Sequence, residues 1–242
     1  PRLLLRLMPS RLKPLLRLPP RLLKKRSNSS CTNKKRGFGP VFRLRCLLAH
    51  WQTSRFRLDL TRPLVMGIVN TTPDSFSDGG QFADANAALD HCKRLIDEGA
   101  DILDIGGESS RPGAAPVSLE QERRRVLPVL EAALALGRPV SIDTTKPELM
   151  AQALALGVDI INDINALNAP GAIDVVAAHP SCGVCLMHMQ GDPQTMQARA
   201  TYADVVSQVR EVLAARVETL RGRGIAADRI VLDPGIGFGK TV

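Results

Sequence analysis

Polar residues that can bind a ligand or carry charge follow six short apolar runs of this 242-residue chain. They are Asn70, the segment 108–111 (Glu-Ser-Ser-Arg), Asp143, Asn162 with Asp163, His188 and Asp233. Carboxylate and amide oxygens accept N–H donors, whereas an arginine binds phosphate or carboxylate oxygens. A single Asp or Asn after a strand is usually a turn former or a helix cap. Six such endings in succession instead favour one shared binding site.

The longest polar loop, residues 70–80, reads NTTPDSFSDGG. Its Asn70 and Asp78 offer the hard oxygen ligands that Mg²⁺ prefers. The two glycines that end it give the loop the freedom that a lid needs. These residue types predict a mobile, cation-binding loop.

Two further groups suggest complementary roles. Ser109, Ser110 and Arg111, together with backbone N–H groups, are predicted to grip a phosphate. The carboxylates of Asp143 and Asp233 and the amide oxygen of Asn162 are hydrogen-bond acceptors, which suits a ligand that presents several N–H donors. The alternative for each residue alone is a polar side chain in a loop that is hydrogen-bonded within the protein and has no functional role.

The elements that position these residues alternate along the chain. Apolar runs rich in β-branched residues occupy 63–70, 101–106, 139–143, 158–163, 183–188 and 229–233. Runs this short and this apolar are typical of strands that are buried on both faces of a parallel sheet. Because parallel strands point the same way, their polar ends converge on one rim, where α/β barrels hold their active sites.

Helix signals fill the segments between the runs. Ser118 followed by Gln121 predicts a capping box, and Pro147 with Gly157 marks the first turn and the end of another helix. A longer helix is expected over about 202–221. Six βα repeats predict an α/β protein, and this pattern alone leaves both a doubly wound sheet and a (β/α) barrel open.

The net charge of +8 is the sum of two unlike segments. Residues 1–58 contain 16 Lys and Arg and no Asp or Glu, whereas 59–242 contain the other 16 and all 24 acidic residues, which gives +16 and −8. We therefore expect a basic, disordered N-terminal extension over 1–58 and a mildly acidic folded domain over 59–242. Three interpretations of the extension compete: a segment without a structural role, a transit peptide, or an arm that binds nucleic acid or anionic membrane.

Composition and failed motifs exclude several classes. No run of about 18 uncharged apolar residues is present, so a transmembrane helix is not expected, and five irregularly spaced cysteines argue against a secreted disulfide framework. The glycine-rich segment 233–241 lacks the P-loop spacing, because Pro234 stands where a glycine is required. We expect a cytoplasmic protein that binds small molecules and neither nucleic acid nor membrane.

Several long motifs together resemble the dihydropteroate synthase family. They are MGIVNTTPDSFSDGG (66–80), DIGGESSRPGA (104–114), SIDTTKPEL, IINDINAL, CLMHMQGDPQTMQ and LDPGIGFGKT, in the family's order from about residue 60 to the end. The resemblance implies a (β/α)8 TIM barrel. It implies a transferase that joins 4-aminobenzoate to 6-hydroxymethyl-7,8-dihydropterin diphosphate, forming dihydropteroate and pyrophosphate.

The resemblance also assigns roles by motif position. Asp143, Asp233 and Arg111 are implied to act in catalysis, and Asn70 and Asp78 to hold Mg²⁺ with the pyrophosphate. The remaining substrate-binding positions are Asn162, Ser110, Met187, Phe76, Pro112, Gly237 and Phe238. Among these, Phe76, Pro112 and Phe238 are implied to line the aminobenzoate pocket, which sulfonamides also occupy in the family. Ser110 replaces the threonine of many relatives but keeps its hydroxyl.

The predicted barrel is incomplete, because only about six of the eight βα units can be counted. The family's Lys-Ser and Arg-x-His motifs, which belong to the last two units, are not found. We therefore expect the 242-residue chain to be nearly inactive and its full-length parent to be an active synthase that forms a homodimer. Two alternatives remain: another pterin-binding barrel of the methyltetrahydrofolate methyltransferase type, and a truncated domain that binds without turnover.

Overall fold

The computed structural model of the chain describes residues 50–71, 80–111, 113–191, 193, 195–197 and 200–240. Each of the six predicted apolar runs forms a strand. The strands of the main sheet are β3 (Met66–Asn70), β4 (Ile102–Gly106), β5 (Val140–Asp143), β6 (Ile160–Asp163), β7 (Gly183–Met187) and β8 (Ile230–Asp233). The helices are α1 (Gly80–Asp97), α2 (Leu119–Leu134), α3 (Pro147–Leu156), α4 (Ala172–Ala178), α5 (Val205–Gly222) and the 3₁₀ turn η2 (Ala227–Arg229).

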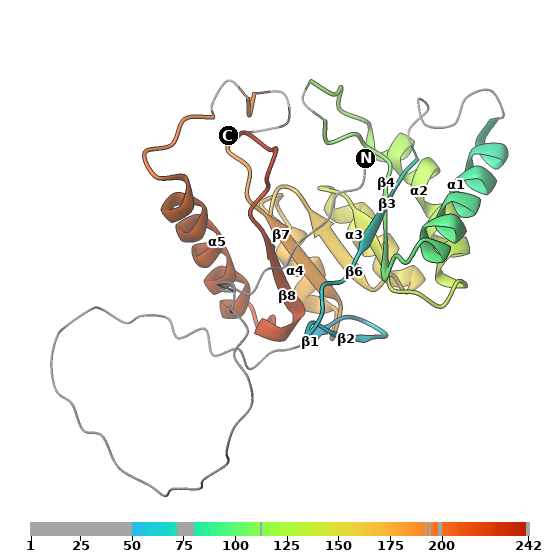
Figure 1. Ribbon diagram of the computed structural model, residues 1–242, viewed down its shortest axis with the longest axis horizontal. Coiled ribbons are helices and arrows are strands. Elements are labelled where there is room, and N and C mark those ends of the chain that lie inside the picture. Colours follow the sequence, from blue (N-terminus) through green and yellow to red (C-terminus); the bar gives the residue numbers. More distant parts are fainter. Residues whose placement is uncertain are drawn as a thin grey trace, which may run out of the picture. The chain divides into compact units, whose positions relative to one another are not determined.

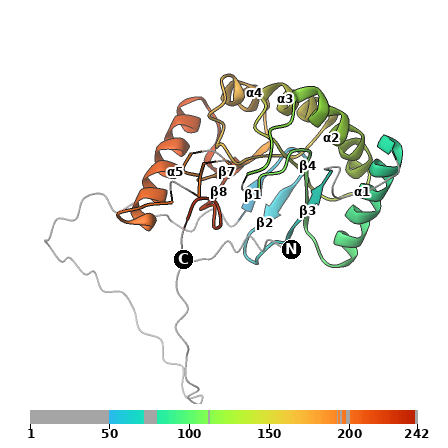
Figure 2. The ribbon, with the colours of Figure 1, turned by 90° about the horizontal axis from the view of Figure 1, so that it is seen from above.

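The order of the strands in the sheet distinguishes a barrel from a doubly wound sheet. The six strands are parallel and stand in their sequence order, β3-β4-β5-β6-β7-β8. Helices α1 to α5 form an arc around the strands (Figure 2), with the sheet curving inside it (Figure 1). A doubly wound sheet would reverse its strand order and place helices on both faces. The arrangement is six consecutive units of a TIM barrel, and β3 and β8 are not paired with each other in the part of the chain described.

The predicted helix boundaries follow from their capping residues. Ser118 caps α2, and both bonds of its capping box with Gln121 are formed. Pro147 opens α3, which ends at Gly157 in the left-handed conformation with φ 100°. Asp204 caps α5 by accepting hydrogen bonds from the first-turn backbone, so that helix begins at Val205 rather than near 202. No helix within the described residues is both long and apolar enough to cross a membrane.

The two faces of the sheet pack against different partners. Alternate strand residues, such as Leu103, Ile142 and Leu186, belong to a large core shared with the helices. The residues between them face the barrel interior, where a small apolar layer fills the lower part. Its members are Trp51, Leu64, Met66, Ile102, Ile160, Cys185 and Val231.

A hairpin below the barrel corrects the predicted domain boundary. Strands β1 (His50–Gln52) and β2 (Arg57–Asp59) pair antiparallel, so the boundary predicted at residue 58 falls inside this hairpin. Trp51 is 3% exposed and its indole nitrogen donates a 2.9 Å hydrogen bond to the Arg229 carbonyl oxygen. The hairpin therefore belongs to the barrel, and the rest of the predicted extension, residues 1–49, lies outside the described residues.

An ion pair fastens the same hairpin to the underside of the sheet. Arg55 Nη2 lies 2.6 Å from Oδ2 of Asp159, whose side chain is fully buried. Arg55 lies in the stretch 1–58, which contains no Asp or Glu, and this explains why the sequence alone assigned the hairpin to the basic extension.

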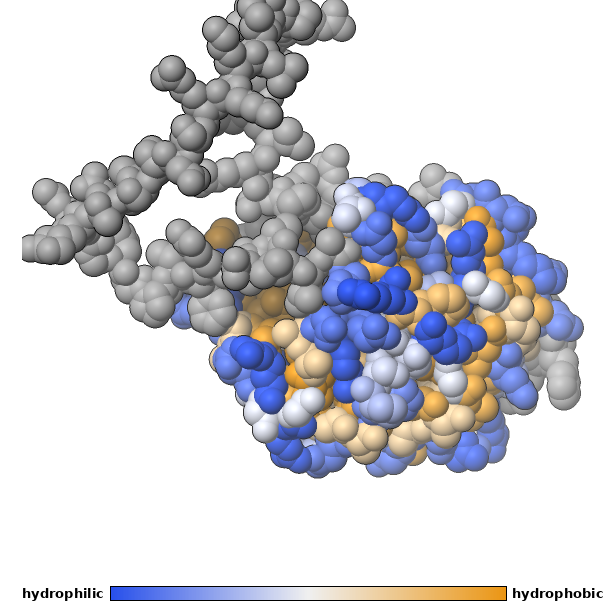
Figure 3. Space-filling view, turned by 90° about the horizontal axis from the view of Figure 1, so that it is seen from below, coloured by the Kyte–Doolittle hydropathy of each residue, from blue (hydrophilic) through white to orange (hydrophobic). Residues whose placement is uncertain are grey.

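Viewed from below in Figure 3, the described surface interleaves hydrophilic and hydrophobic side chains.

Candidate active site

The polar strand ends gather on one rim, as predicted. Cross-strand partners of a parallel sheet point to the same face, and Gly106, Asp143 and Asn162 are successive partners across β4, β5 and β6. Asn70 is the partner of Gly106 on the other side. Asp233 is the partner of Met187 at the ends of β8 and β7. We call the interior-facing polar set at or near the C-terminal ends of these strands, together with Met187, the cup: Asn70, Asp104, Asp143, Asn162, Met187 and Asp233.

Asp163 is the exception among the predicted rim residues. It follows Asn162 directly and therefore faces the opposite side of the sheet. Its carboxylate accepts hydrogen bonds from the backbone N–H groups of Asn165 (2.7 Å) and Leu167 (2.8 Å). Asp163 thus shapes the loop after β6 and is not a ligand of the cup, which is the turn-forming role that a polar strand end commonly plays.

Asp104 belongs to the cup although its position within a strand did not mark it as a rim residue. It lies in the middle of β4, is 4% exposed, and its Oδ2 accepts a 3.0 Å hydrogen bond from Asn162 Nδ2. Its Oδ1 is buried without a hydrogen-bond partner among the described residues. The sequence held one signal: a carboxylate inside an otherwise apolar run, Ile102-Leu-Asp-Ile-Gly106.

The carboxyl groups of the cup share an environment that disfavours negative charge. Burial raises the pKa of Asp143 well above its usual range, and the nearby carboxylates of Asp104, Asp163, Glu122 and Glu108 raise it further. Burial also raises the pKa of Asp104, opposed by the neighbouring Ser141 hydroxyl and the Asn162 amide.

Asp233 follows the same rule: burial raises its pKa, opposed by the Gly235 N–H and by Lys240. A ligand rich in N–H donors, or one that gains positive charge, relieves the repulsion among these groups.

The loop after β4 stands beside these carboxyl groups and is anchored from two sides. Lys146 Nζ contacts one carboxylate oxygen of Glu108, in the loop, and one of Glu122, on α2. Arg125 Nη1 donates a 2.8 Å hydrogen bond to the Gly107 carbonyl oxygen. A side chain at Gly107 would meet Val126 at 2.7 Å, so the loop fits closely on α2. This anchoring fixes the position of the segment that follows.

Ser110 and Arg111 follow this anchored segment. Ser110 is partly buried and Arg111 is exposed. Arg111 makes no ion pair with any residue that the structure describes. These positions fit the predicted phosphate-binding role, although Pro112, the next residue, lies outside the described part of the chain.

The loop after β8 is held by its own lysine. Lys240 Nζ donates to three carbonyl oxygens, those of His188 (3.0 Å), Gly235 (2.9 Å) and Phe238 (3.0 Å). Asp233 Oδ1 accepts a 2.7 Å hydrogen bond from the Gly235 N–H. Lys240 therefore ties the loop after β8 to the residue that follows β7. Sequence reasoning missed this positioning role of Lys240.

Backbone geometry explains the glycines of that loop. Gly235 has φ +66°, and a Cβ there would lie 2.1 Å from the His188 carbonyl oxygen. Gly237 has φ +95°, again a conformation that favours glycine. The loop carries the partly buried Phe238, whose carbonyl oxygen shares the Lys240 ammonium with that of His188. His188 follows Met187, which ends β7 and is 4% exposed. The structure brings three predicted substrate residues, Met187, Gly237 and Phe238, to the same side of the barrel.

The predicted Mg²⁺ ligands are described only in part. Asn70 is exposed at the end of β3, and its amide has no hydrogen bond within the described residues, which fits a ligand of a hard cation. Asp78 and Phe76 lie outside the described residues. No cluster of three or more His, Cys, Asp or Glu suited to a metal occurs in the described part of the chain. The Mg²⁺ site therefore stays a prediction.

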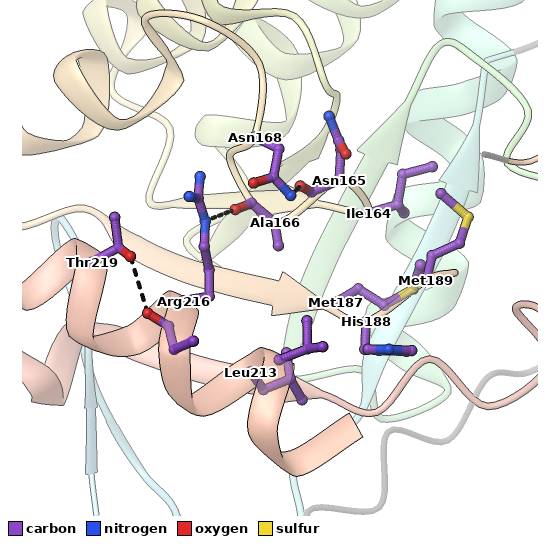
Figure 4. Close-up of a pocket in the computed structure, with 12 residues that line it drawn as sticks. Ile164, Asn165, Ala166, Asn168, Met187, His188, Met189, Leu213, Arg216 and Thr219 are labelled. Atoms are coloured by element: carbon purple, nitrogen blue, oxygen red, sulfur yellow. Dashed lines mark hydrogen bonds between the residues drawn. The ribbon is translucent and has the colours of Figure 1, made fainter. Parts of the chain in front are cut away.

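A cavity of about 360 Å³ lies beside the cup, between α5 and the loop after β6 (Figure 4). Met187 at the end of β7 and the next residue, His188, line it on one side, and Arg216 lines it from α5. Arg216 donates to the carbonyl oxygens of Ala166 and Leu167. Both of these residues have positive φ, 51° and 59°. Arg216 and Asp163 together hold this strained loop next to Asn162.

Comparison with known proteins agrees with this geometry. The profile of the family described as "Pterin binding enzyme" matches residues 66–242. A dihydropteroate synthase from Neisseria meningitidis serogroup C is 53% identical over 194 residues, which are 79% of this chain and 69% of that protein.

Two solved structures are similar in sequence and in fold. A Burkholderia cenocepacia dihydropteroate synthase complexed with 7,8-dihydropteroate has 52% identity and a TM-score of 0.71, covering 80% of this chain and 65% of that one. A Xanthomonas albilineans dihydropteroate synthase with 4-aminobenzoic acid has 50% identity and a TM-score of 0.70, covering 76% and 66%. The chain thus spans about two thirds of the length of these relatives. With its parallel barrel strands and its acceptor-lined cup, the chain belongs to the pterin binding enzyme family and, within it, to the dihydropteroate synthases.

Proposed function

We propose that this chain contributes the pterin-binding and diphosphate-binding part of a dihydropteroate synthase. The reaction joins 4-aminobenzoate to 6-hydroxymethyl-7,8-dihydropterin diphosphate and releases pyrophosphate. The observation that carries the proposal is the cup, in which Asp104, Asp143, Asn162 and Asp233 converge from four strands as acceptors. Relatives at 50% identity or more were solved with 7,8-dihydropteroate or 4-aminobenzoic acid, which supports the same ligand classes here.

The pterin ring is the ligand that the acceptors of the cup suit. Its amino group and ring N–H groups would donate to Asp143, Asn162 and Asp233, while Met187 offers an apolar contact for its face. When the bond between the pterin methylene and the diphosphate oxygen breaks, positive charge develops on the pterin. Carboxyl groups already held close together stabilise that charge without rearrangement.

The diphosphate would lie towards the loop after β4. Ser110 and Arg111 donate hydrogen bonds to its oxygens, and the Glu108–Lys146–Glu122 contacts keep that loop in place. A Mg²⁺ ion held by Asn70 and Asp78, when bound, would neutralise negative charge on the departing pyrophosphate. Arg111 acts in the same way, because its positive charge stabilises the negative charge that increases on the departing pyrophosphate.

The amine completes a direct displacement. The nitrogen lone pair of 4-aminobenzoate forms the new N–C bond, the C–O electron pair leaves with pyrophosphate, and the amine then loses one proton. Phe238 is a described part of the proposed aminobenzoate pocket, whereas Phe76 and Pro112 remain predicted parts of it. The proposal needs no covalent intermediate with the protein, since the electrophile and the nucleophile meet directly.

A binding experiment tests the function, because pterins are fluorescent. We expect the chain to bind 6-hydroxymethylpterin, measured by fluorescence polarisation, and Asp143→Asn to weaken binding by about ten-fold, the effect of one charged hydrogen bond. A matched control is Asp90→Asn, on the exposed face of α1, which should bind like the wild type. Equal binding by all three proteins, or no binding by the wild type, would contradict the proposal.

Turnover is a separate question. We propose that the 242-residue polypeptide alone condenses its substrates slowly, because β3 and β8 leave the described sheet open. Pyrophosphate release after addition of both substrates measures this, and it also separates a synthase from a methyltransferase, which releases none. Rates near those of a full-length relative would refute the proposal of slow turnover. A homodimeric state and a cytoplasmic location stay proposals, testable by sedimentation and by cell fractionation.

A further inference from the structure

A carboxylate and a carboxamide from two non-adjacent strands form a pair inside the barrel. Asp104 is on β4 and Asn162 is on β6, with β5 between them. The pair is joined by a 3.0 Å hydrogen bond from Asn162 Nδ2 to Asp104 Oδ2. Asp104 is 4% exposed, whereas Asn162 is partly open to the cup. The contact thus connects a buried acid to a residue that a ligand can reach.

The buried acid costs the fold more than a neutral residue would. Asp104 Oδ1 makes no hydrogen bond of good geometry with the described residues, and the hydroxyl of Ser141, its partner on β5, lies near enough only to oppose part of the rise in the pKa of Asp104 that burial causes. An ionisable group with one buried oxygen left unsatisfied is a net penalty for stability. A contribution to stability alone therefore does not account for a carboxylate at this position.

The pair has a chemical consequence for Asn162. A carboxamide has a donor end and an acceptor end of nearly the same shape, so it can sit in a pocket in either of two orientations. An ionised carboxylate only accepts, so in that form Asp104 selects the orientation observed here, in which the NH₂ group of Asn162 faces Asp104. The amide oxygen, to which no described residue donates, is then left for a ligand in the cup.

We infer that Asp104 is a positioning residue that holds the Asn162 carboxamide with its oxygen towards the cup, and so makes this position an acceptor for an N–H group of the bound heterocycle. The inference deepens the proposed function and rests on it for the identity of the ligand. Asp104 itself need not touch the ligand. It sets which edge of a flat heterocycle is accepted, because an edge that presents a carbonyl oxygen would face another acceptor.

The first experiment compares two variants for binding and for stability. Asp104→Asn removes the selection, because an asparagine at 104 can donate to or accept from Asn162. We expect its affinity for 6-hydroxymethylpterin to fall by about ten-fold, with a melting temperature close to that of the wild type. The exchange variant, Asp104→Asn combined with Asn162→Asp, reverses the hydrogen bond and again leaves an acceptor oxygen towards the cup. It should restore binding to within about three-fold of the wild type.

Each outcome of this comparison either supports or overturns the positioning role of Asp104. Wild-type affinity in Asp104→Asn overturns it. A loss in Asp104→Asn that the exchange variant does not recover also overturns it, because the acceptor would then not be the cause. If instead Asp104→Asn lowers the melting temperature and the pterin affinity together, and the exchange variant recovers the melting temperature alone, the role is structural and the inference fails.

A measurement without ligand keeps the inference distinct from the proposed function. In ¹⁵N-labelled protein, the side-chain amide protons of Asn162 should exchange slowly and appear as one set, and Asp104→Asn should remove this protection or double the signals. Exchange in the wild type as fast as that of the exposed Asn70 would overturn the inference, even if the pterin binds. Slow exchange together with a wild type that binds no pterin would support the positioning of Asn162 and refute the proposed function instead.

Discussion

Replacing Lys146 with methionine should cost the barrel more stability than the loss of any exposed ion pair among the described residues. Lys146 Nζ is the partner of Glu122, whose side chain is 1% exposed and whose second carboxylate oxygen has no hydrogen-bond partner among the described residues. Removing one member of a buried ion pair leaves an uncompensated charge, at a cost of about 3–5 kcal/mol. Because the Lys146 side chain is 21% exposed and water can reach the site, we expect a loss near the lower end of that range, about 3 kcal/mol.

Urea unfolding followed by circular dichroism measures this loss, and two further variants interpret it. Lys93→Met removes a surface pair, in which lysine and Asp90 are 52% and 72% exposed, and should cost at most about 0.5 kcal/mol. Lys146→Met combined with Glu122→Gln leaves no buried charge and should recover at least about 1 kcal/mol of the loss. Equal stability of Lys146→Met and Lys93→Met would refute the reasoning, and so would a double variant less stable than Lys146→Met.

Three further predictions concern other parts of the barrel. Trp51→Phe removes the indole hydrogen bond to the Arg229 carbonyl oxygen and should lower the free energy of unfolding by about 1–2 kcal/mol. Urea titration measures this change, and wild-type stability would show that the hydrogen bond does not help to hold the hairpin on the barrel. Burial raises the pKa of Asp163 to about 6, so its stabilising contribution is present at about pH 4 and is lost as the pH rises through about 6, by up to about 3 kcal/mol. Unfolding free energies between pH 4 and 8 should therefore fall less steeply in Asp163→Asn, and an unchanged slope would contradict the assignment. Gly235→Ala forces a Cβ to within 2.1 Å of the His188 carbonyl oxygen and should weaken 6-hydroxymethylpterin binding by at least about ten-fold through displacement of the loop, whereas unaltered affinity would show that the loop is free to shift.

The strands of the sheet could be predicted closely because burial on both faces leaves a strong pattern. The run 139–143 became Val140–Asp143, and 183–188 became Gly183–Met187. Because the strands are parallel, the same pattern also correctly placed their polar ends on one rim. The choice between barrel and doubly wound sheet could not be made this way, since periodicity carries no information on the order of strands within the sheet.

Residues whose role depends on distant partners were the ones that sequence reasoning missed. Trp51 stands in a basic segment, and only its contact with Arg229, 178 positions away, shows that the hairpin is part of the barrel. Asp104 resembles an ordinary strand residue until Asn162 is placed beside it. Lys240 belongs to a glycine-rich motif that suggests phosphate binding, whereas its ammonium is used by three carbonyl oxygens of the neighbouring backbone.

The single tryptophan of the chain sits at the end of the barrel opposite to the cup. Its indole is buried and hydrogen-bonded to η2, so its emission should be blue-shifted in the folded protein and move to the red when the hairpin separates from the barrel. Pterins emit at longer wavelengths from the other end. In one sample, tryptophan emission therefore reports on folding and pterin emission reports on bound ligand. A variant that loses affinity can be checked for an intact barrel in the same measurement.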